Sequence, residues 1–378
     1  MKKLAIIGAS YLQEPLIQKA RHMGIETHVF AWAANDVGEK SADFFYPISI
    51  VEKDAILHKC REIGVDGICS IASDLAMVTV NYVAERLRFT GNSTECTARS
   101  TNKRKMRQCF EQNGDPSPKS ILVDNVADLQ GITLNYPVIV KPTDRSGSRG
   151  ITKLESNAGL QEAIDRAKRL SFEGHALVEE FVIGQEYSVE CISWQGEHHF
   201  LAMTHKYTTG SPMFIETGHL QPAPLTGELL ERVKTVVFHA LNGLGIGYGA
   251  SHSELKIAPN GEIALIEIGG RMGGDFIGSD LVFLSSGYDF VKAVIEIALG
   301  QKPSGTVGIP SAAAVRFVFG PEDVFVFRKI QEEHPEIIVR QDVTKQFDHK
   351  VVDSSSRFGY YLLQSDDAEL LRKYMPKE

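Results

Sequence analysis

Short apolar runs alternate with amphipathic stretches over the N-terminal quarter of the chain. The apolar runs typical of buried strands lie at residues 4–7, 27–30 and 67–71. The amphipathic stretches typical of helices lie at residues 15–23, 54–63 and 75–87. Because strands and helices that alternate in this way form a parallel sheet covered by helices, we expect an α/β unit at the N-terminus.

Apolar and polar positions also alternate on both sides of Asn260 and Gly261. Asn-Gly between two apolar-rich runs is a strong hairpin signal, because both residues of a two-residue turn take positive φ angles. Counting outward from such a turn places Glu254 opposite Glu267. Every other pair follows the same register, so that the residue after Glu254 faces Ile266.

Two carboxylates that face each other across a pair of strands need a compensating charge. Directly opposite side chains lie roughly 5 Å apart at Cβ, and like charges at that separation are destabilising. A divalent cation between Glu254 and Glu267 removes this cost, and Mg²⁺ typically takes one or two carboxylates together with water and substrate phosphates. The pair is a candidate magnesium site, and the alternative is two solvated glutamates on an exposed sheet face.

Composition narrows the class of protein. A length of 378 residues suggests two or three domains, and a hydrophobic fraction of 43% is ordinary for a globular protein. The net charge of −8, without a basic stripe, argues against nucleic acid as a partner. No signal peptide or membrane span is expected, because a strand follows Met-Lys-Lys directly and no run of eighteen apolar residues occurs. Five cysteines without a C-x-x-C pair predict reduced thiols in a cytoplasmic protein.

Two loops divide the first third of the chain. Residues 8–13 follow the first strand, where a dinucleotide fingerprint would lie, but they lack G-x-G-x-x-G. The N-terminal unit is therefore expected to be a scaffold whose strand ends face a neighbouring site, and a nicotinamide dehydrogenase is disfavoured. A helix expected at residues 100–110 ends at the breaker-rich residues 113–118, the best candidate for a domain boundary.

Lysines occur at two places where an anion site is expected. Lys103 begins a basic run at residues 103–107, although such runs are usually solvated helix faces. Lys141 ends an apolar strand, and the loop after it contains Ser146, Gly147 and Ser148, whose backbone N–H groups are suited to closing on a phosphate. No G-K-[ST] follows, so this is not a Walker A loop, and an ordinary hairpin turn is the alternative.

Acidic residues surround a predicted turn at residues 183–184. Glu179 and Glu180 end a buried strand before this turn, and Glu186 lies just after it. A backbone that crosses in this way is suited to reading the edge of a base while a carboxylate binds ribose hydroxyls. The alternative is a set of surface charges, which is the usual location of acidic residues.

The order of these signals resembles the ATP-grasp superfamily from Gly8 to about residue 300. Residues 141–150, 249–254 and 267–277 look most like its carboxylate–amine ligases, namely the L-amino-acid ligases with their carbamoyl-phosphate-synthetase-like and biotin-carboxylase-like relatives. The resemblance implies an ATP-grasp fold with a Rossmann-like pre-ATP-grasp domain at 1–98 and an ATP-grasp domain at 99–305. That domain would have a small lobe at about 115–180 and a large lobe at about 181–305. A small β-rich lobe at 306–378 would follow, for structural support or for contact with a second subunit, as in a homodimer.

Roles for individual residues follow from this resemblance. Lys103 and Lys141 would neutralise ATP phosphates, and Ser146, Gly147 and Ser148 would form a flexible lid. Base and ribose would meet the Glu179 side chain, the backbone of Glu180 and Val182, and the Glu186 carboxylate. Glu254 and Glu267 would hold Mg²⁺, or Mn²⁺ in its place, and Arg271 would steady an acyl phosphate. Many family members have asparagine, usually a metal ligand, where this chain has Gly269, which puts a second Mg²⁺ in doubt.

The implied activity is an ATP- and Mg²⁺-dependent ligase that activates a carboxylate as an acyl phosphate and couples it to an amine, releasing ADP and phosphate. Small-molecule carboxylates and amines would be its partners, and neither nucleic acid nor membrane is expected. Lys206, Glu216 and His219 are further candidates for the substrate pocket, and His252 for contact with substrate or metal-bound water. The alternatives are a carboxylase that acts through carboxyphosphate and a non-catalytic nucleotide-binding partner protein.

Overall fold

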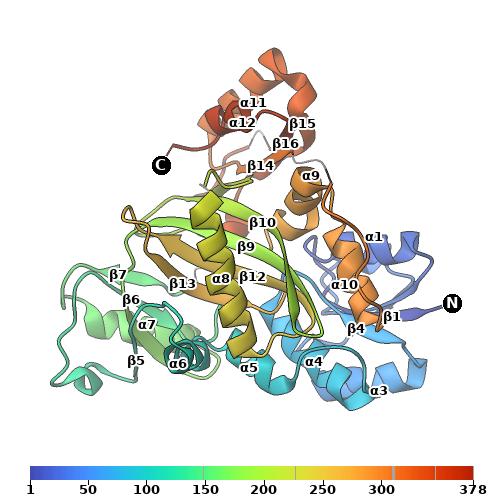
Figure 1. The fold of residues 1–378 in the computed structure, drawn as a ribbon, viewed down its shortest axis with the longest axis horizontal. Coiled ribbons are helices and arrows are strands. Elements are labelled where there is room, and N and C mark those ends of the chain that lie inside the picture. The colour runs from blue at the N-terminus through green and yellow to red at the C-terminus, as the bar shows by residue number, and fades with distance from the viewer. Residues whose placement is uncertain (148, 226, 309–310, 345, 378) are drawn as a thin grey trace.

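The computed structural model describes residues 1–147, 149–225, 227–308, 311–344 and 346–377. Within these ranges three β-sheets organise the chain (Figure 1), with a four-stranded sheet on either side of a central eight-stranded one. In that view the N-terminal sheet lies on the right, and the sheet formed by residues 120–180 lies on the left. No helix in the described ranges has both the length and the apolar character needed to cross a bilayer.

The N-terminal sheet is parallel, in the order β3-β2-β1-β4, as the alternating pattern predicts. Its strands are β1 (Lys3–Ile7), β2 (Glu26–Phe30), β3 (Phe44–Tyr46) and β4 (Gly67–Cys69). Its helices are α1 (Glu14–His22), α2 (Val37–Ser41), α3 (Lys53–Ile63) and α4 (Asp74–Leu87). The sequence pattern does not predict β3 or α2, because segments of three and five residues are too short to show a period.

Two helices, α5 (Thr94–Thr101) and α6 (Lys103–Asn113), lie where the sequence predicts one helix from residue 100. Asn102 separates them, because its extended backbone ends α5 and its side chain accepts a hydrogen bond from the Lys105 backbone N–H at 3.1 Å. The break places Lys103 at the start of α6, where its backbone N–H donates to the Thr143 carbonyl at 2.7 Å. The loop that follows Lys141 is thereby tied to this helix.

The small sheet is antiparallel, in the order β5-β8-β6-β7. Its strands are β5 (Ser120–Val123), β6 (Val138–Pro142), β7 (Thr152–Leu154) and β8 (Ala176–Glu180). Val138 and Val140 of β6 pack into a core with the helix α7 (Leu160–Leu170). Because side chains alternate along a strand, Ile139 and Lys141 point to the other face, which lines a cleft.

The central sheet has the order β13-β12-β9-β10-β11-β14-β16-β15, and every pairing in it is antiparallel. Its first five strands along the chain are β9 (Gln185–Trp194), β10 (Glu197–Thr208), β11 (Glu216–Gln221), β12 (Gly249–Ile257) and β13 (Ile263–Gly269). The helix α8 (Gly227–Leu244) packs on one face through an apolar cluster that includes Val237, Leu241 and Leu255.

The C-terminal strands do not form a sheet of their own. β14 (Ala312–Phe317) pairs with β11, β16 (Gly359–Ser365) pairs with β14, and β15 (Ile338–Val343) forms the outer edge. The helices α11 (Pro321–Glu333) and α12 (Ala368–Lys373) cover this end of the sheet. The predicted β-rich C-terminal lobe is therefore a continuation of the central sheet with its own helical layer.

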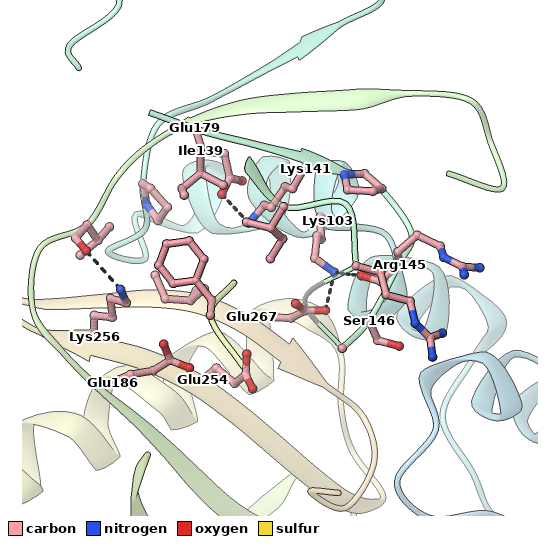
Figure 2. Close-up of a pocket in the computed structure, with 18 of the residues that line it drawn as sticks. Lys103, Ile139, Lys141, Arg145, Ser146, Glu179, Glu186, Glu254, Lys256 and Glu267 are labelled. Carbon is pink, nitrogen blue, oxygen red and sulfur yellow. Dashed lines mark hydrogen bonds and ion pairs between the residues drawn. The ribbon is translucent and has the colours of Figure 1, made fainter. Parts of the chain in front are cut away.

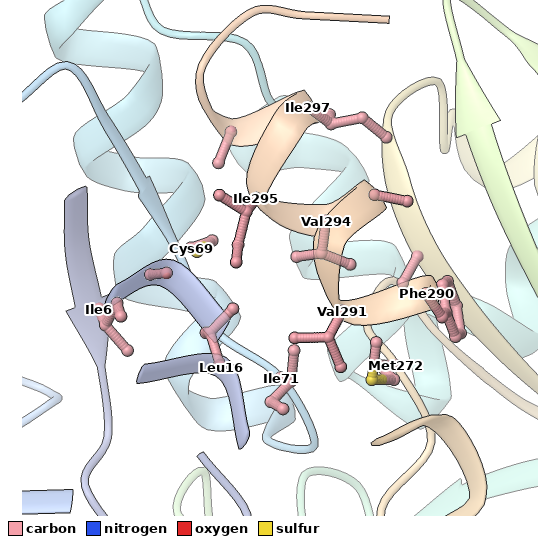
Figure 3. Close-up of a cluster of buried hydrophobic side chains, with 14 of the residues drawn as sticks. Ile6, Leu16, Cys69, Ile71, Met272, Phe290, Val291, Val294, Ile295 and Ile297 are labelled. Atoms are coloured by element: carbon pink, nitrogen blue, oxygen red, sulfur yellow. The ribbon is translucent and has the colours of Figure 1, made fainter. Parts of the chain in front are cut away.

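A shared apolar core joins the N-terminal sheet to the central one. The helix α10 (Phe290–Ala298) lies between them, with α9 (Val282–Ser286) immediately before it in the chain. Figure 3 shows Val291 and Ile295 of α10 facing Leu16 and Ile6 of the N-terminal unit. These side chains are at least 95% buried, so the two units pack on each other through a continuous hydrophobic layer.

The hairpin of β12 and β13 confirms the predicted pairing of Glu254 with Glu267 by an unexpected route. The turn is a three-residue loop rather than the predicted two-residue turn, because Ala258 pairs with Glu262 and Gly261 takes φ 81°. This shifts the register by one residue, so Leu255 faces Leu265 and not Ile266. A β-bulge between residues 254 and 255 shifts it back, and the two displacements cancel at the glutamate pair.

Candidate functional site

A cleft lies between the small sheet and the central sheet (Figure 2). It brings together the residues selected from the sequence: Lys103, Lys141, Ser146, Gly147, Glu179, Glu180, Val182, Glu186, Glu254, Glu267 and Arg271. Ser148, the third residue of the expected lid, lies outside the described residues. The cleft encloses about 160 Å³, which is below the roughly 300–1,000 Å³ of typical small-molecule pockets.

The side of the cleft formed by α6 and the small sheet carries more positive than negative charge. Glu179 pairs with Lys141 at 2.5 Å and with Arg107 at 2.9 Å, and all three side chains are at least 94% buried. Burial raises the pKa of Glu179, but the two cations together lower it to about 2. The pKa of Lys141 is lowered by burial. The Glu179 carboxylate raises it, but because Glu179 is shared with Arg107 it does not offset the effect of burial. An added anion such as a polyphosphate would relieve this excess of positive charge.

Lys103 joins this cationic group to the candidate metal pair. Its ammonium donates to Glu267 Oε1 at 2.8 Å and to the Arg145 carbonyl at 2.7 Å. Both Lys103 and Arg107 are about 95% buried, so the alternative of a solvated helix face at residues 103–107 does not hold for these two. The sequence analysis missed Arg107, and only its position four residues after Lys103, on the same helix face, pointed to it.

The floor of the cleft, on the central sheet, carries the opposite excess. Lys206 lies among three carboxylates, at 2.6 Å from Glu254, 3.1 Å from Glu186 and 3.8 Å from Glu216. Burial lowers the pKa of Lys206, but these carboxylates together raise it well above its ordinary value. Lys256 also interacts with Glu186, so the three carboxylates still outnumber the two lysines, which leaves the floor suited to a further cation.

His252 and Glu190 form a buried pair beside Glu254. Glu190 is fully buried, and it accepts hydrogen bonds from His252 Nδ1 and from the Gly273 backbone N–H, the latter at 3.0 Å. The other ring nitrogen of His252 lies 3.2 Å from Glu254 Oε1. Burial lowers the pKa of His252, but the two carboxylates raise it to about 9. The imidazolium thus places a fixed positive charge next to one candidate metal ligand.

The donor set fits Mg²⁺ held by two carboxylates. Glu254 and Glu267 lie opposite each other on neighbouring strands, and each is about a quarter or less exposed. In the described part of the chain no group of three or more His, Cys, Asp or Glu side chains forms a metal cage. Mg²⁺ keeps several waters and substrate phosphates in its shell, so two protein carboxylates at a cleft are a suitable set.

Aromatic and cationic side chains surround the backbone expected to contact a base. Phe181 lies between Glu180 and Val182 and lines the cleft. The ammonium groups of Lys153 and Lys256 lie 4.3 Å and 4.9 Å from the centre of its ring. Lys256 also donates to the Val182 carbonyl at 3.4 Å. Residues 181–182 are therefore contacted by lysines from both the small sheet and the central sheet.

The far wall of the cleft reaches the C-terminal region, which the sequence did not predict. Glu216 lines the cleft and accepts a hydrogen bond from Ser354 Oγ at 3.1 Å. Arg357 donates to the Glu216 carbonyl at 3.3 Å and to both oxygens of Asp275 at 2.8 Å. His219, another candidate, is buried and does not line the cleft.

Arg271 is held by the N-terminal unit. Its Nε and Nη2 donate to the two oxygens of Asp74, at 2.9 and 3.0 Å, and its Nη1 donates to the Met272 carbonyl at 3.3 Å. Asp74 lies on the first turn of α4, directly after the Ser73 N-cap. The sequence analysis missed Asp74, because its partner is almost 200 residues away in the chain and no local pattern links them.

Comparison with known proteins identifies the fold. Residues 134–280 match the family described as ATP-grasp domain. The L-amino acid ligase from Bacillus licheniformis superposes with a TM-score of 0.85 at 23% identity, over 99% of this chain and 96% of that one. The biotin carboxylase domain of Hydrogenobacter thermophilus 2-oxoglutarate carboxylase, solved with MgADP, ADP and bicarbonate, gives 0.76 at 18% identity, over 97% and 86%. The predicted ATP-grasp fold is confirmed.

Among curated relatives, the alanine–anticapsin ligase of Bacillus subtilis (strain 168) is 27% identical over 302 residues. The match covers 70% of this chain and 64% of that protein, so the chain spans less than two thirds of this relative's length.

Proposed function

We propose that this chain, which carries an ATP-grasp domain at residues 134–280, is an ATP- and Mg²⁺-dependent ligase that joins a carboxylate to an amine. One observation carries the proposal, namely the division of the cleft into a cationic side around Lys141 and an acidic floor around Lys206. A polyphosphate suits the first, and a divalent cation or an ammonium group suits the second. The triphosphate of ATP would bind the cationic side. Its Mg²⁺, and later the amine substrate, would bind the acidic floor.

The first step is transfer of the γ-phosphoryl group of ATP to the substrate carboxylate, which gives an acyl phosphate and ADP. Lys103 and Lys141 bind and orient the phosphates, and Arg271 stabilises the charge that builds up on the transferred group. Glu254 and Glu267 would hold one Mg²⁺, which supplies charge neutralisation at the phosphate oxygens when bound. Glu179 holds Lys141, and Asp74 holds Arg271. The contact of the Glu179 side chain with the base stays a proposal beside this role.

In the second step an amine attacks the acyl carbon, the C–N bond forms, and the C–O bond to the phosphate breaks. The amine must lose a proton as it attacks, and the Glu216 carboxylate on the acidic floor is suited to binding the ammonium form before that loss, while Glu186 binds the ribose hydroxyls. We propose amino acids or small acids as the carboxylate and a small amine or amino acid as the acceptor. The name of the curated relative, a ligase of alanine, supports this substrate class.

Two observations bear on the setting and on the nearest alternative. All five cysteines are unpaired and buried, which supports the proposed reducing, cytoplasmic location. The bicarbonate in the similar biotin carboxylase domain keeps a carboxylase acting through carboxyphosphate as a second candidate. We also propose that the C-terminal strands can form a homodimer contact. Mn²⁺ is proposed as a substitute for Mg²⁺.

The test is release of inorganic phosphate from ATP by the purified chain. A ligase gives phosphate release that requires Mg²⁺ and an added carboxylate, and a mass spectrum then shows the amide product when an amine is present. Phosphate release that depends on bicarbonate instead would identify the carboxylase. Tight binding of MgADP without any turnover across a panel of amino acids would contradict both and favour a nucleotide-binding partner protein.

A further inference from the structure

Arg271 is held by Asp74, a residue of the N-terminal unit, although Arg271 itself follows β13 of the central sheet. The Asp74 carboxylate and the Arg271 guanidinium form two parallel hydrogen bonds, and their side chains are 15% and 14% exposed. A bidentate pair of this kind fixes the plane of the guanidinium as well as its position. Arg271 lines the nucleotide cleft, whereas Asp74 lies behind it, beside a neighbouring cavity.

This pair occupies the space above Gly269. A Cβ atom at residue 269 would lie 2.7 Å from Asp74 Oδ1 and 3.1 Å from Arg271 Nε. The first distance is shorter than real Cβ contacts, so the carboxylate would have to shift, and a shift distorts its two hydrogen bonds to Arg271. Gly269 lies in β13 and has no positive φ, so its backbone would accept other residues. Space, and not conformation, therefore requires glycine at this position.

We propose that Asp74 is a positioning residue for Arg271, and that Gly269 is glycine because it leaves room for this carboxylate. A side chain at residue 269 would displace this carboxylate from its place beside Arg271. The active site is thus completed across the boundary between the N-terminal unit and the central sheet. The inference rests on the proposed function, because it gives Asp74 a role in phosphoryl transfer that is exerted through Arg271.

The first test compares alanine at two adjacent glycines. Gly269→Ala forces the carboxylate away, whereas Gly270→Ala is the matched control, because its Cβ would find its nearest neighbour, Ser100 Oγ, at 3.5 Å. Since a misplaced catalytic group costs on the order of 100-fold in rate, we expect Gly269→Ala and Asp74→Asn each to lower kcat by about 10- to 100-fold. The KM for ATP should change less than about threefold, as for a group that acts in the transition state. Gly270→Ala should keep the parent values.

A double substitution separates this mechanism from other effects of residue 269. If Gly269→Ala acts by displacing Asp74, then it has no further effect on kcat in an Asp74→Ala background. A full additional loss in that background would show that residue 269 acts by another route, and it would overturn the inference.

A second readout does not depend on turnover. In spectra of the protein labelled with ¹⁵N-arginine, the Arg271 Nε–H signal, assigned by its loss in Arg271→Lys, should be protected from exchange in the parent and in Gly270→Ala. Protection should be lost in Asp74→Asn and Gly269→Ala. If Asp74→Asn and Gly269→Ala kept the parent kcat, or if the Arg271 Nε–H of the parent were not protected, the inference would be overturned. The proposed function would not be affected by either result. A parent without carboxylate-dependent turnover would overturn the proposed function, and with it this role for Asp74.

Discussion

Replacing Glu179 with glutamine should lower the free energy of unfolding. The stability of the variant should then increase when a polyanion is added. Glu179 is the counter-charge of both Lys141 and Arg107, and all three side chains are buried. Its pKa of about 2, against an ordinary 4.5, corresponds to roughly 3 kcal/mol at about 1.4 kcal/mol for each pH unit. Removal of one partner from a buried ion pair typically costs about 3–5 kcal/mol, which agrees with this figure.

The pH dependence of this loss has a defined sign. Because the folded-state pKa of Glu179 is lowered, its contribution to stability is present above the unfolded value of 4.5 and is lost as the pH falls toward 2. Chemical denaturation of the parent and of Glu179→Gln should therefore differ by about 3 kcal/mol at pH 7, and the difference should shrink below pH 4.5. Inorganic tripolyphosphate should restore more stability to the variant than it adds to the parent.

Lys119, an exposed lysine close to the same sheet, provides the control. Lys119→Gln should leave both the stability and its response to tripolyphosphate unchanged. A Glu179→Gln protein as stable as the parent at pH 7 would show that Glu179 does not hold the cationic group together. Equal effects of tripolyphosphate on both proteins would refute the assignment of this group as the phosphate site.

Three further predictions test other parts of the site. Glu267→Gln should abolish ATP turnover with an unchanged circular dichroism spectrum, and turnover at the parent rate would refute the metal assignment. Lys206→Met should lower the Tm in the absence of divalent ions, because three carboxylates lose their shared cation, and Mg²⁺ should raise the Tm of this variant more than that of the parent. Lys234→Met, which removes a lysine that pairs with Glu231 and lies over the Phe200 ring but contacts none of these three carboxylates, should show no such response to Mg²⁺. Gly261→Ala should cost about 1 kcal/mol of stability, since φ is 81°, and should leave the KM for ATP unchanged.

Local patterns were sufficient for most of the fold. The period of the apolar residues predicted the N-terminal α/β unit, and the order of the motifs predicted the ATP-grasp fold. The pairing of Glu254 with Glu267 was also confirmed, although the turn and the bulge each departed from the assumed register. A bulge depends on packing across the sheet, so no pattern within the hairpin itself specifies it.

The partners of the site residues could not be read from the sequence in the same way. Arg107 looked like part of a solvated helix face, because burial by a distant strand leaves no trace in a short basic run. Asp74 and Arg357 come from opposite ends of the chain, and only the assembled sheets bring them to Arg271 and Glu216. The sequence thus predicted which residues line the cleft better than it predicted what holds them there.

The continuous eight-stranded sheet also has a consequence for synthesis on the ribosome. β11, the strand that begins with Glu216, has a free hydrogen-bonding edge until β14 emerges, and β14 then waits for β16, which ends at Ser365. A nascent chain therefore carries an open sheet edge until β14 and β16 have both been made, and such edges invite pairing between chains. We expect a product that stops before residue 312 to aggregate or to recruit chaperones, even though it contains every residue assigned to nucleotide or metal.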